Sequence, residues 1–72
     1  MNTDTRNGAR PLAEREWFSP DQAAEYLGLT SRAMEDMRYR KTGPGYSRVN
    51  TRTIRYRRAD LDAWLEAGRV RA

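Results

Sequence analysis

Residues Tyr46 to Arg58 read YSRVNTRTIRYRR, and this stretch predicts a two-stranded β-hairpin. Its apolar residues Val49, Ile54 and Tyr56 alternate with polar and basic ones, as strands do when one face rests on a core. The stretch contains five arginines and no acidic residue. The outer face of the hairpin is therefore expected to be cationic, with the three apolar side chains inward.

The strands of this hairpin are expected at residues 46–49 and 53–56, and its tip at residues 50–52. Asn50 is the tip residue best able to adopt a positive φ, because asparagine tolerates the left-handed region better than most residues. Arg57 and Arg58 follow the second strand, next to the start of a helix. At least one of them is expected to have a structural role.

Upstream of the hairpin, capping signals mark two short helices. Ser19, Pro20 and Gln22 form the pattern of a capping box with proline at the first helical position, so a helix is expected over residues 20–27. Its inward residues should be Ala23, Ala24 and Leu27. Gly28 ends it, because glycine readily adopts the left-handed conformation that stops helices.

Thr30 is the expected N-cap of a second helix over residues 31–41, which the sequence TGPG at 42–45 then stops. Met34 and Met37 should face inward, and Leu29 should point back into the core. The tight turn at residues 27–30 has the spacing of a helix-turn-helix, in which the second helix enters the major groove of DNA. A plain helical hairpin within a core remains the alternative.

A third helix is expected over residues 58–67, with Leu61, Trp64 and Leu65 on its inward face and Gly68 at its end. Trp64 is interpreted as a core anchor. Together these elements predict an α+β fold, a winged helix-turn-helix with a two-stranded β-hairpin wing and a C-terminal helix. Residues 1–16 are expected to be a flexible arm, residues 17–69 a single domain, and residues 70–72 a tail.

The composition of the chain argues against an enzyme, a metal-binding protein and a membrane protein. The chain of 72 residues has no histidine and no cysteine, and it lacks the spacing of a glycine-rich phosphate loop, so we expect no enzyme, no cofactor and no metal site. Asp60 and Asp62 are interpreted as surface charges of a helix. No apolar run approaches a membrane span, and no signal peptide is recognisable, so the bacterial cytoplasm, in association with the nucleoid, is the expected location.

The net charge of +4 is concentrated in the middle of the chain, whereas residues 19–30 carry only the acids Asp21 and Glu25. A basic stripe of this kind is typical of a protein that binds a polyanion. A solvated surface would be the simpler interpretation of an isolated basic run, but the adjacent helix-turn-helix pattern favours double-stranded DNA.

Two motifs, AAEYLGLT at 23–30 and IRYRRADLDAWL at 54–65, separated by a Gly/Pro loop, resemble the small winged helix-turn-helix family of excisionases (recombination directionality factors), AlpA-like and MerR-like DNA-binding proteins. The resemblance covers residues 17–69. It implies a protein that binds cooperatively near an attachment site of a phage or mobile element, bends DNA and directs an integrase toward excision. A small transcriptional regulator, or a protein-interaction module that docks on an integrase or repressor, is the alternative. Self-association on DNA is also implied.

The second helix is the expected recognition helix. Arg32 is the best candidate to read a guanine edge, because a guanidinium can bond O6 and N7 together, and Ser31 is expected to bond a phosphate. Glu35 either accepts from a cytosine amino group or pairs with Arg32, and Asp36 is expected to pair with Arg32 or Arg40. For both acids the ion pair is favoured. Tyr39 either donates to a phosphate or packs under the wing. The expected contacts of this helix are Ser31, Arg32, Glu35, Arg38, Tyr39, Arg40 and Lys41.

In the wing, Arg52 at the tip is expected to enter a minor groove, whose negative potential attracts arginine. Arg48 and Arg55 should reach phosphates on either side of it. The expected contacts of the wing are Arg48, Thr51, Arg52, Thr53 and Arg55. The wing tip lacks the glycine that similar proteins often have there, which leaves its geometry open.

Overall fold

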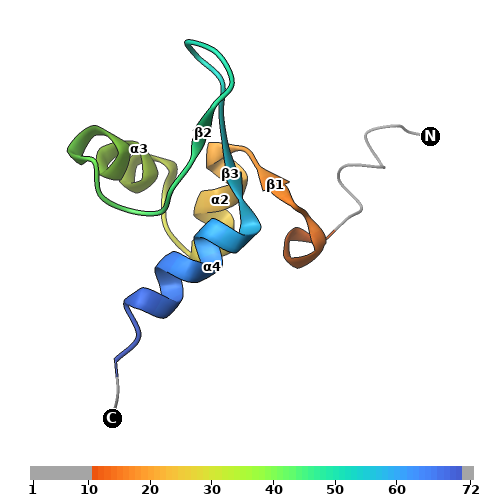
Figure 1. Cartoon of the computed structure of the whole chain (residues 1–72), viewed down its shortest axis with the longest axis vertical. Coiled ribbons are helices and arrows are strands. Elements are labelled where there is room, and N and C mark those ends of the chain that lie inside the picture. Colours follow the sequence, from red (N-terminus) through yellow and green to blue (C-terminus); the bar gives the residue numbers. More distant parts are fainter. Residues whose placement is uncertain (1–10, 71–72) are drawn as a thin grey trace.

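Figure 1 shows the computed structural model of the chain, which describes residues 11–70. Residues 1–10 of the predicted arm and residues 71–72 of the predicted tail lie outside the described part. The elements follow the order η1 (Leu12–Glu14), β1 (Trp17–Phe18), α2 (Pro20–Leu27), α3 (Ser31–Arg40), β2 (Ser47–Arg48), β3 (Ile54–Arg57) and α4 (Arg58–Ala67). Three α-helices and a small antiparallel sheet confirm the α+β winged helix-turn-helix fold.

The predicted capping box determines where α2 begins. The hydroxyl oxygen of Ser19 accepts from the backbone N–H of Gln22 at 3.2 Å, and the N–H of Ser19 donates to Oε1 of Gln22 at 3.0 Å. Gly28, with φ 75°, ends the helix in the left-handed conformation, as predicted. Leu29 follows it but is 38% exposed, so the expectation that this side chain returns to the core is wrong.

The hydroxyl of Thr30 caps α3 by accepting from the N–H of Ala33 at 3.0 Å. The helix ends at Arg40, one residue earlier than predicted, because Lys41 has a positive φ of 61°. Gly43, with φ 83°, lies against Met37: a Cβ at this position would be 2.9 Å from Sδ of the methionine. The loop after α3 can therefore pack closely on the helix only with glycine there.

The sheet has three strands in the order β1-β3-β2. β2 and β3 form the predicted hairpin, in which Arg48 is opposite Ile54. β1 adds a third strand that the sequence did not indicate, with Trp17 opposite Arg57 and Phe18 opposite Tyr56. This strand brings the chain before α2 to the same end of the sheet at which α4 begins.

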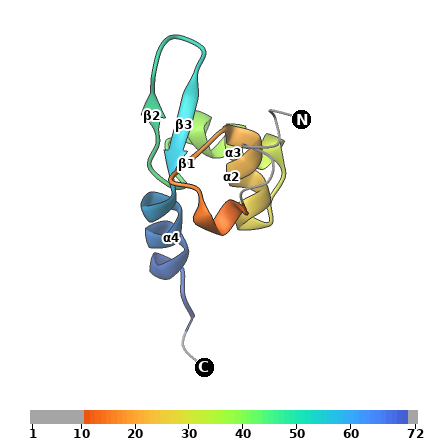
Figure 2. The same cartoon turned by 90° about the vertical axis from the view of Figure 1, so that its right-hand side faces the viewer.

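Among residues 11–70, seven buried apolar side chains form the core, and η1 adds a partly buried one, Leu12, packed against them. Viewed from the side, α2 and α3 lie together on one side of the sheet and α4 continues from β3 below it (Figure 2). The seven side chains of this core are those of Phe18, Ala23, Ala24, Met34, Ile54, Tyr56 and Leu61.

Two details of the predicted hairpin are wrong. Val49 is 65% exposed and does not join Ile54 and Tyr56 on the inner face. Asn50 does not adopt a positive φ; among the described residues other than glycine, only Lys41 does. Instead Oδ1 of Asn50 accepts from the N–H groups of Arg52 and Thr53, each at 2.9 Å. The tip turns around this side chain.

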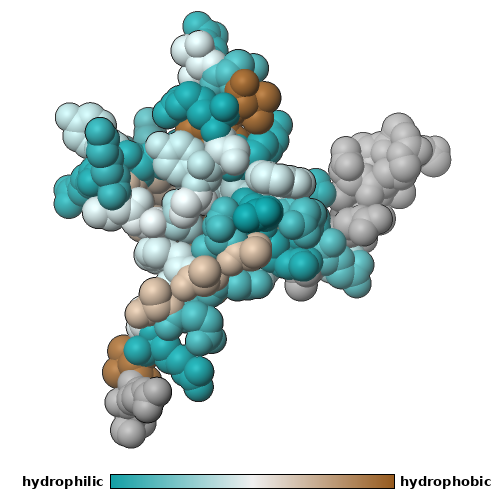
Figure 3. All heavy atoms as spheres, viewed as in Figure 1, coloured by the Kyte–Doolittle hydropathy of each residue, from teal (hydrophilic) through white to brown (hydrophobic). Residues whose placement is uncertain are grey.

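Of the three residues predicted on the inward face of α4, Leu61 is fully buried, but the other two are not. Leu65 is 46% exposed, and Trp64 is only half-buried and lies outside the cluster of buried side chains. The reason is the course of the helix, which extends away from the core toward its C-terminal end (Figure 1). Figure 3 shows moderately hydrophobic residues along this exposed part of the molecule. Trp64 is therefore not a core anchor.

Candidate nucleic-acid interface

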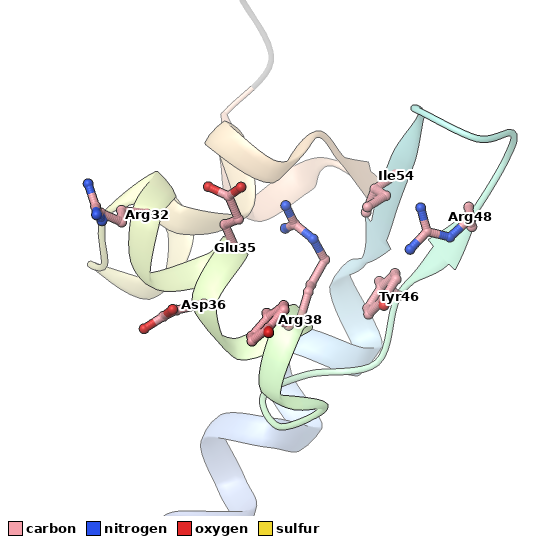
Figure 4. A pocket seen from close by; sticks show the side chains of 8 residues that line it. Arg32, Glu35, Asp36, Arg38, Tyr46, Arg48 and Ile54 are labelled. Carbon is pink, nitrogen blue, oxygen red and sulfur yellow. The ribbon is translucent and has the colours of Figure 1, made fainter.

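A groove separates the exposed face of α3 from the wing, the hairpin formed by β2, β3 and the residues between them. Its volume is about 530 Å³, and Figure 4 shows side chains from both elements around it. The helix contributes cationic, acidic and aromatic groups, and the wing contributes an arginine and apolar surface. The lining residues are Arg32, Glu35, Asp36, Arg38, Tyr39, Tyr46, Arg48 and Ile54.

On α3, two charged groups are exposed and make no hydrogen bond or ion pair within residues 11–70. These are Arg32, in the first turn, and Glu35, three residues later. The predicted pair between them is therefore absent from this part of the chain. Tyr39 is 86% exposed, which excludes the alternative that its ring packs under the wing.

Arg38 links α3 to the sheet. Its Nη1 donates to the hydroxyl of Tyr56 at 2.8 Å, and its side chain is partly buried. The ring of Tyr56 in turn contacts that of Tyr46, with centroids 5.7 Å apart. The guanidinium of Arg38 is thus held in a fixed place beside the groove, where its other N–H groups can meet an anion.

Other predicted contacts of α3 are engaged with neighbouring residues. The hydroxyl of Ser31 donates to Oδ1 of Asp21 at 2.5 Å, so a carboxylate stands near the start of α3. A phosphate at Ser31 would have to displace it. Arg40 lies 3.9 Å from Asp36 in an exposed i,i+4 pair, which is the predicted alternative for this acid. Lys41 is exposed at the C-cap.

In the wing, backbone carbonyls hold two of the predicted arginines. Nη1 of Arg48 donates to the carbonyl of Thr51 at 3.2 Å, and Nη1 of Arg55 donates to that of Ile54 at 2.8 Å. Arg52 is exposed at the tip, and its side chain has no partner within residues 11–70. Thr53 is half-buried and Thr51 is exposed.

The two arginines after β3 both have structural contacts, as expected for at least one of them. Nε of Arg57 is 4.0 Å from Asp60, one turn into α4. Arg58 donates to the carbonyl of Arg15 at 3.2 Å and lies 3.9 Å from the carboxylate of Glu16. Arg58 therefore joins the start of α4 to the segment that leads into β1.

Sequence reasoning missed Tyr46 and Ile54 as groove residues and Asn50 as the group that shapes the tip. Tyr46 was recognisable only as an aromatic residue at the start of a strand, which indicates packing as readily as binding. The signal for Asn50 was stronger, because asparagine side chains often bond backbone N–H groups two or three residues ahead.

The comparison with protein families gives one match: the model of a helix-turn-helix domain, found in excisionase-like and AlpA-like small DNA-binding proteins, matches residues 17–69. No curated protein matches the chain. No helix among residues 11–70 has the length and apolar character needed to cross a membrane, and these residues contain no acidic cluster suited to a metal ion. Because the match covers well over half of the chain, the protein belongs to this family and is a DNA-binding protein.

Proposed function

We propose that this helix-turn-helix protein binds double-stranded DNA with α3 in the major groove and the wing in the adjacent minor groove. The observation that carries the proposal is the groove between these two elements, which has Arg38 on one side and Arg48 on the other. A helix and a hairpin that enter neighbouring grooves must straddle one sugar–phosphate strand. Fixed guanidinium groups on both sides of such a strand suit its phosphates.

The remaining contacts follow from this placement. Arg32, whose side chain has no partner among the described residues, is assigned to a guanine edge. Arg52, whose side chain is exposed at the wing tip, is assigned to the minor groove. Phosphates on the flanks are assigned to Ser31, Tyr39, Arg40, Lys41, Thr51, Thr53 and Arg55, and Ser31 takes part once Asp21 releases its hydroxyl.

The salt dependence of binding tests this function. If about five arginines contact phosphates, the logarithm of the association constant should fall with the logarithm of salt concentration at a slope of about −4 to −5. Fluorescence anisotropy with a labelled duplex at several salt concentrations measures this slope. An affinity that does not change with salt would contradict phosphate binding as its basis.

Within the family, we propose the role of an excisionase that acts on bacterial nucleoid DNA. A single domain of this size reads few base pairs, so specificity would require several copies on adjacent sites. Bending a site by 40–90° costs on the order of 1–6 kcal/mol, which contacts shared between the copies and an integrase would offset. A transcriptional regulator of the same fold is the second candidate within this class.

An excision assay with a cognate integrase, with and without the protein, separates these two roles. An excisionase should increase the excised product several-fold. No increase, together with a footprint over a promoter, would favour the transcriptional role. A footprint on the DNA flanking the gene also identifies the site to use in both experiments.

A protein-interaction module is a candidate function of a different class from DNA binding, and exposed apolar side chains favour it. Trp17 is 47% exposed and Leu65 is 46% exposed. A gel shift with random duplex at low salt distinguishes this class, because an interaction module would leave the duplex unshifted.

A further inference from the structure

We infer that Glu35 determines base specificity on α3, by selecting cytosine through its exocyclic amino group in the major groove. The inference rests on the proposed placement of α3 and adds to it the residue that discriminates between bases. The sequence favours an ion pair of Glu35 with Arg32, whereas this inference takes the other alternative, a contact with cytosine.

The first argument is the difference between the two neighbouring acids of α3. Asp36 is 3.9 Å from Arg40 and its charge is compensated there. Glu35 has arginines three residues away on both sides, at positions 32 and 38, and pairs with neither within residues 11–70. Figure 4 shows the two carboxylates pointing in different directions. Of the two carboxylates that line the groove, Glu35 is thus the one that has no ion-pair partner in the described part of the chain.

The second argument is where the neighbouring cations are held. Arg38 donates to the hydroxyl of Tyr56, and Arg48, across the groove, donates to the carbonyl of Thr51. Each guanidinium uses one N–H group for a partner other than Glu35, and its remaining N–H groups are available to phosphates. The carboxylate of Glu35 therefore keeps its full acceptor capacity when a duplex approaches.

The third argument is what a duplex can offer this carboxylate. Phosphates repel it, and so do the acceptors O6 and N7 of guanine and O4 of thymine. Cytosine presents an amino group and no acceptor in the major groove, whereas adenine places the N7 acceptor beside its amino group. A carboxylate in this position gains a favourable contact only with a base that presents an amino donor. It therefore binds cytosine most strongly and disfavours guanine and thymine.

Selection of bound duplexes from a random pool tests the inference with the wild type and Glu35→Gln. The wild type should enrich cytosine at one position, with a preference of about 5- to 150-fold. Glu35→Gln should move the preference at that position to adenine, because a glutamine amide bonds N6 and N7 together. Glu35 is exposed and pairs with no group among the described residues, so the melting temperature of the variant should equal that of the wild type.

Glu25→Gln is the matched control, since Glu25 is an exposed acid of α2 that lies outside the groove lining. It removes the same charge and should leave base preference unchanged. If Glu35→Gln enriches the same sites as the wild type, or if the wild type binds duplexes without base preference, Glu35 is not the discriminating residue although DNA binding stands. If the wild type binds no duplex at low salt, both the proposed function and this inference are overturned.

Discussion

The arginines near the groove and the wing differ in whether another group of the protein holds them. Arg38 is bonded to Tyr56 and Arg57 is paired with Asp60, so each contributes to the fold as well as to the surface potential. The side chains of Arg32 and Arg52 have no partner within residues 11–70. Substitution of a free arginine should affect binding alone, whereas substitution of a held one should affect stability too.

Arg52→Ala is expected to weaken DNA binding without a change in thermal stability. The variant loses one phosphate or minor-groove contact, so the salt slope should become less steep by about 0.9. Anisotropy titrations and thermal unfolding measure the two quantities. Arg69→Ala is the matched control for the binding titration, because Arg69 is an exposed arginine at the far end of the molecule, and its exposed pair with Glu66 contributes little to stability. A large fall in melting temperature for Arg52→Ala would assign Arg52 to the fold instead.

Tyr26 gives α2 and α4 a connection that depends on pH. Its hydroxyl donates to Oδ1 of Asp62 at 2.5 Å. This hydrogen bond, followed by burial and the charge of Asp62, raises the pKa of Tyr26 above its usual value of 10.0. A raised pKa means that the bond contributes stability below pH 10, and that this contribution is lost as the pH rises through the pKa of the folded state.

Tyr26→Phe should therefore be less stable than the wild type at neutral pH, and the difference should shrink above pH 10. Phenylalanine retains the ring contact with Phe18, whose centroid lies 5.1 Å from that of Tyr26. Thermal unfolding of both proteins across this pH range measures the effect. Tyr39→Phe, on an 86% exposed side chain, should behave like the wild type throughout. A pH-independent difference for Tyr26→Phe would show that the phenolic proton is not involved.

At the scale of elements, the helices were predictable because local chemistry decides where each begins and ends. Ser19 with Gln22, Gly28 and Thr30 act on backbone groups within a few residues of themselves. The strands were less predictable. β1 has only two residues, which is too few to display an alternating pattern, and it forms only because β3 is there to pair with it.

Within the hairpin, the position of Val49 likewise could not be predicted from the alternating pattern alone. Alternation placed it inward, but the residue lies beyond the last pair of β2 and β3, where the chain has already begun to turn. Trp64 and Leu65 likewise follow a helical period that continues after α4 has left the core. Periodicity identifies a face, and tertiary packing decides how much of that face is covered.

The wing tip provides a prediction for an element. Asn50→Ala removes the side-chain acceptor of the N–H groups of Arg52 and Thr53, while the N–H of Thr53 keeps the carbonyl of Asn50 at 3.3 Å, so amide hydrogen exchange should become faster chiefly at Arg52. Because the tip is exposed and water replaces the lost acceptor, the cost in stability should be less than about 1 kcal/mol. DNA binding should weaken, since Arg52 then samples more orientations. Asn50→Asp keeps the acceptor and should keep exchange slow; equally fast exchange in the wild type and Asn50→Ala would contradict this account of the tip.

For the whole molecule, the candidate interface could be predicted only in part. The sequence indicated which helix and which hairpin carry the cations. It did not indicate the groove between them, because Tyr46 and Ile54 reach it through the pairing of β2 with β3 and the packing of α3. Nor did it separate Glu35 from Asp36, whose different surroundings depend on side-chain orientation.

The small size of the core leads to a prediction about DNA and heat stability. With seven buried apolar side chains, a domain of this length has a net stability of about 3–5 kcal/mol. A ligand that binds only the folded state adds about 2.7 kcal/mol at 100 times its dissociation constant, and each kcal/mol shifts the melting temperature of such a domain by about 4–8 °C. A specific duplex at that concentration should therefore raise the melting temperature by roughly 10–20 °C.

Thermal unfolding with and without duplex measures this rise, and salt provides its control. Because phosphate contacts supply much of the affinity, the rise should diminish sharply at high salt, while the melting temperature of the free protein changes little. Arg52→Ala at the same duplex concentration should show a smaller rise than Arg69→Ala. A rise of the same size at high salt would mean that apolar contacts, such as those of the exposed Val49, supply the binding energy in place of the arginines.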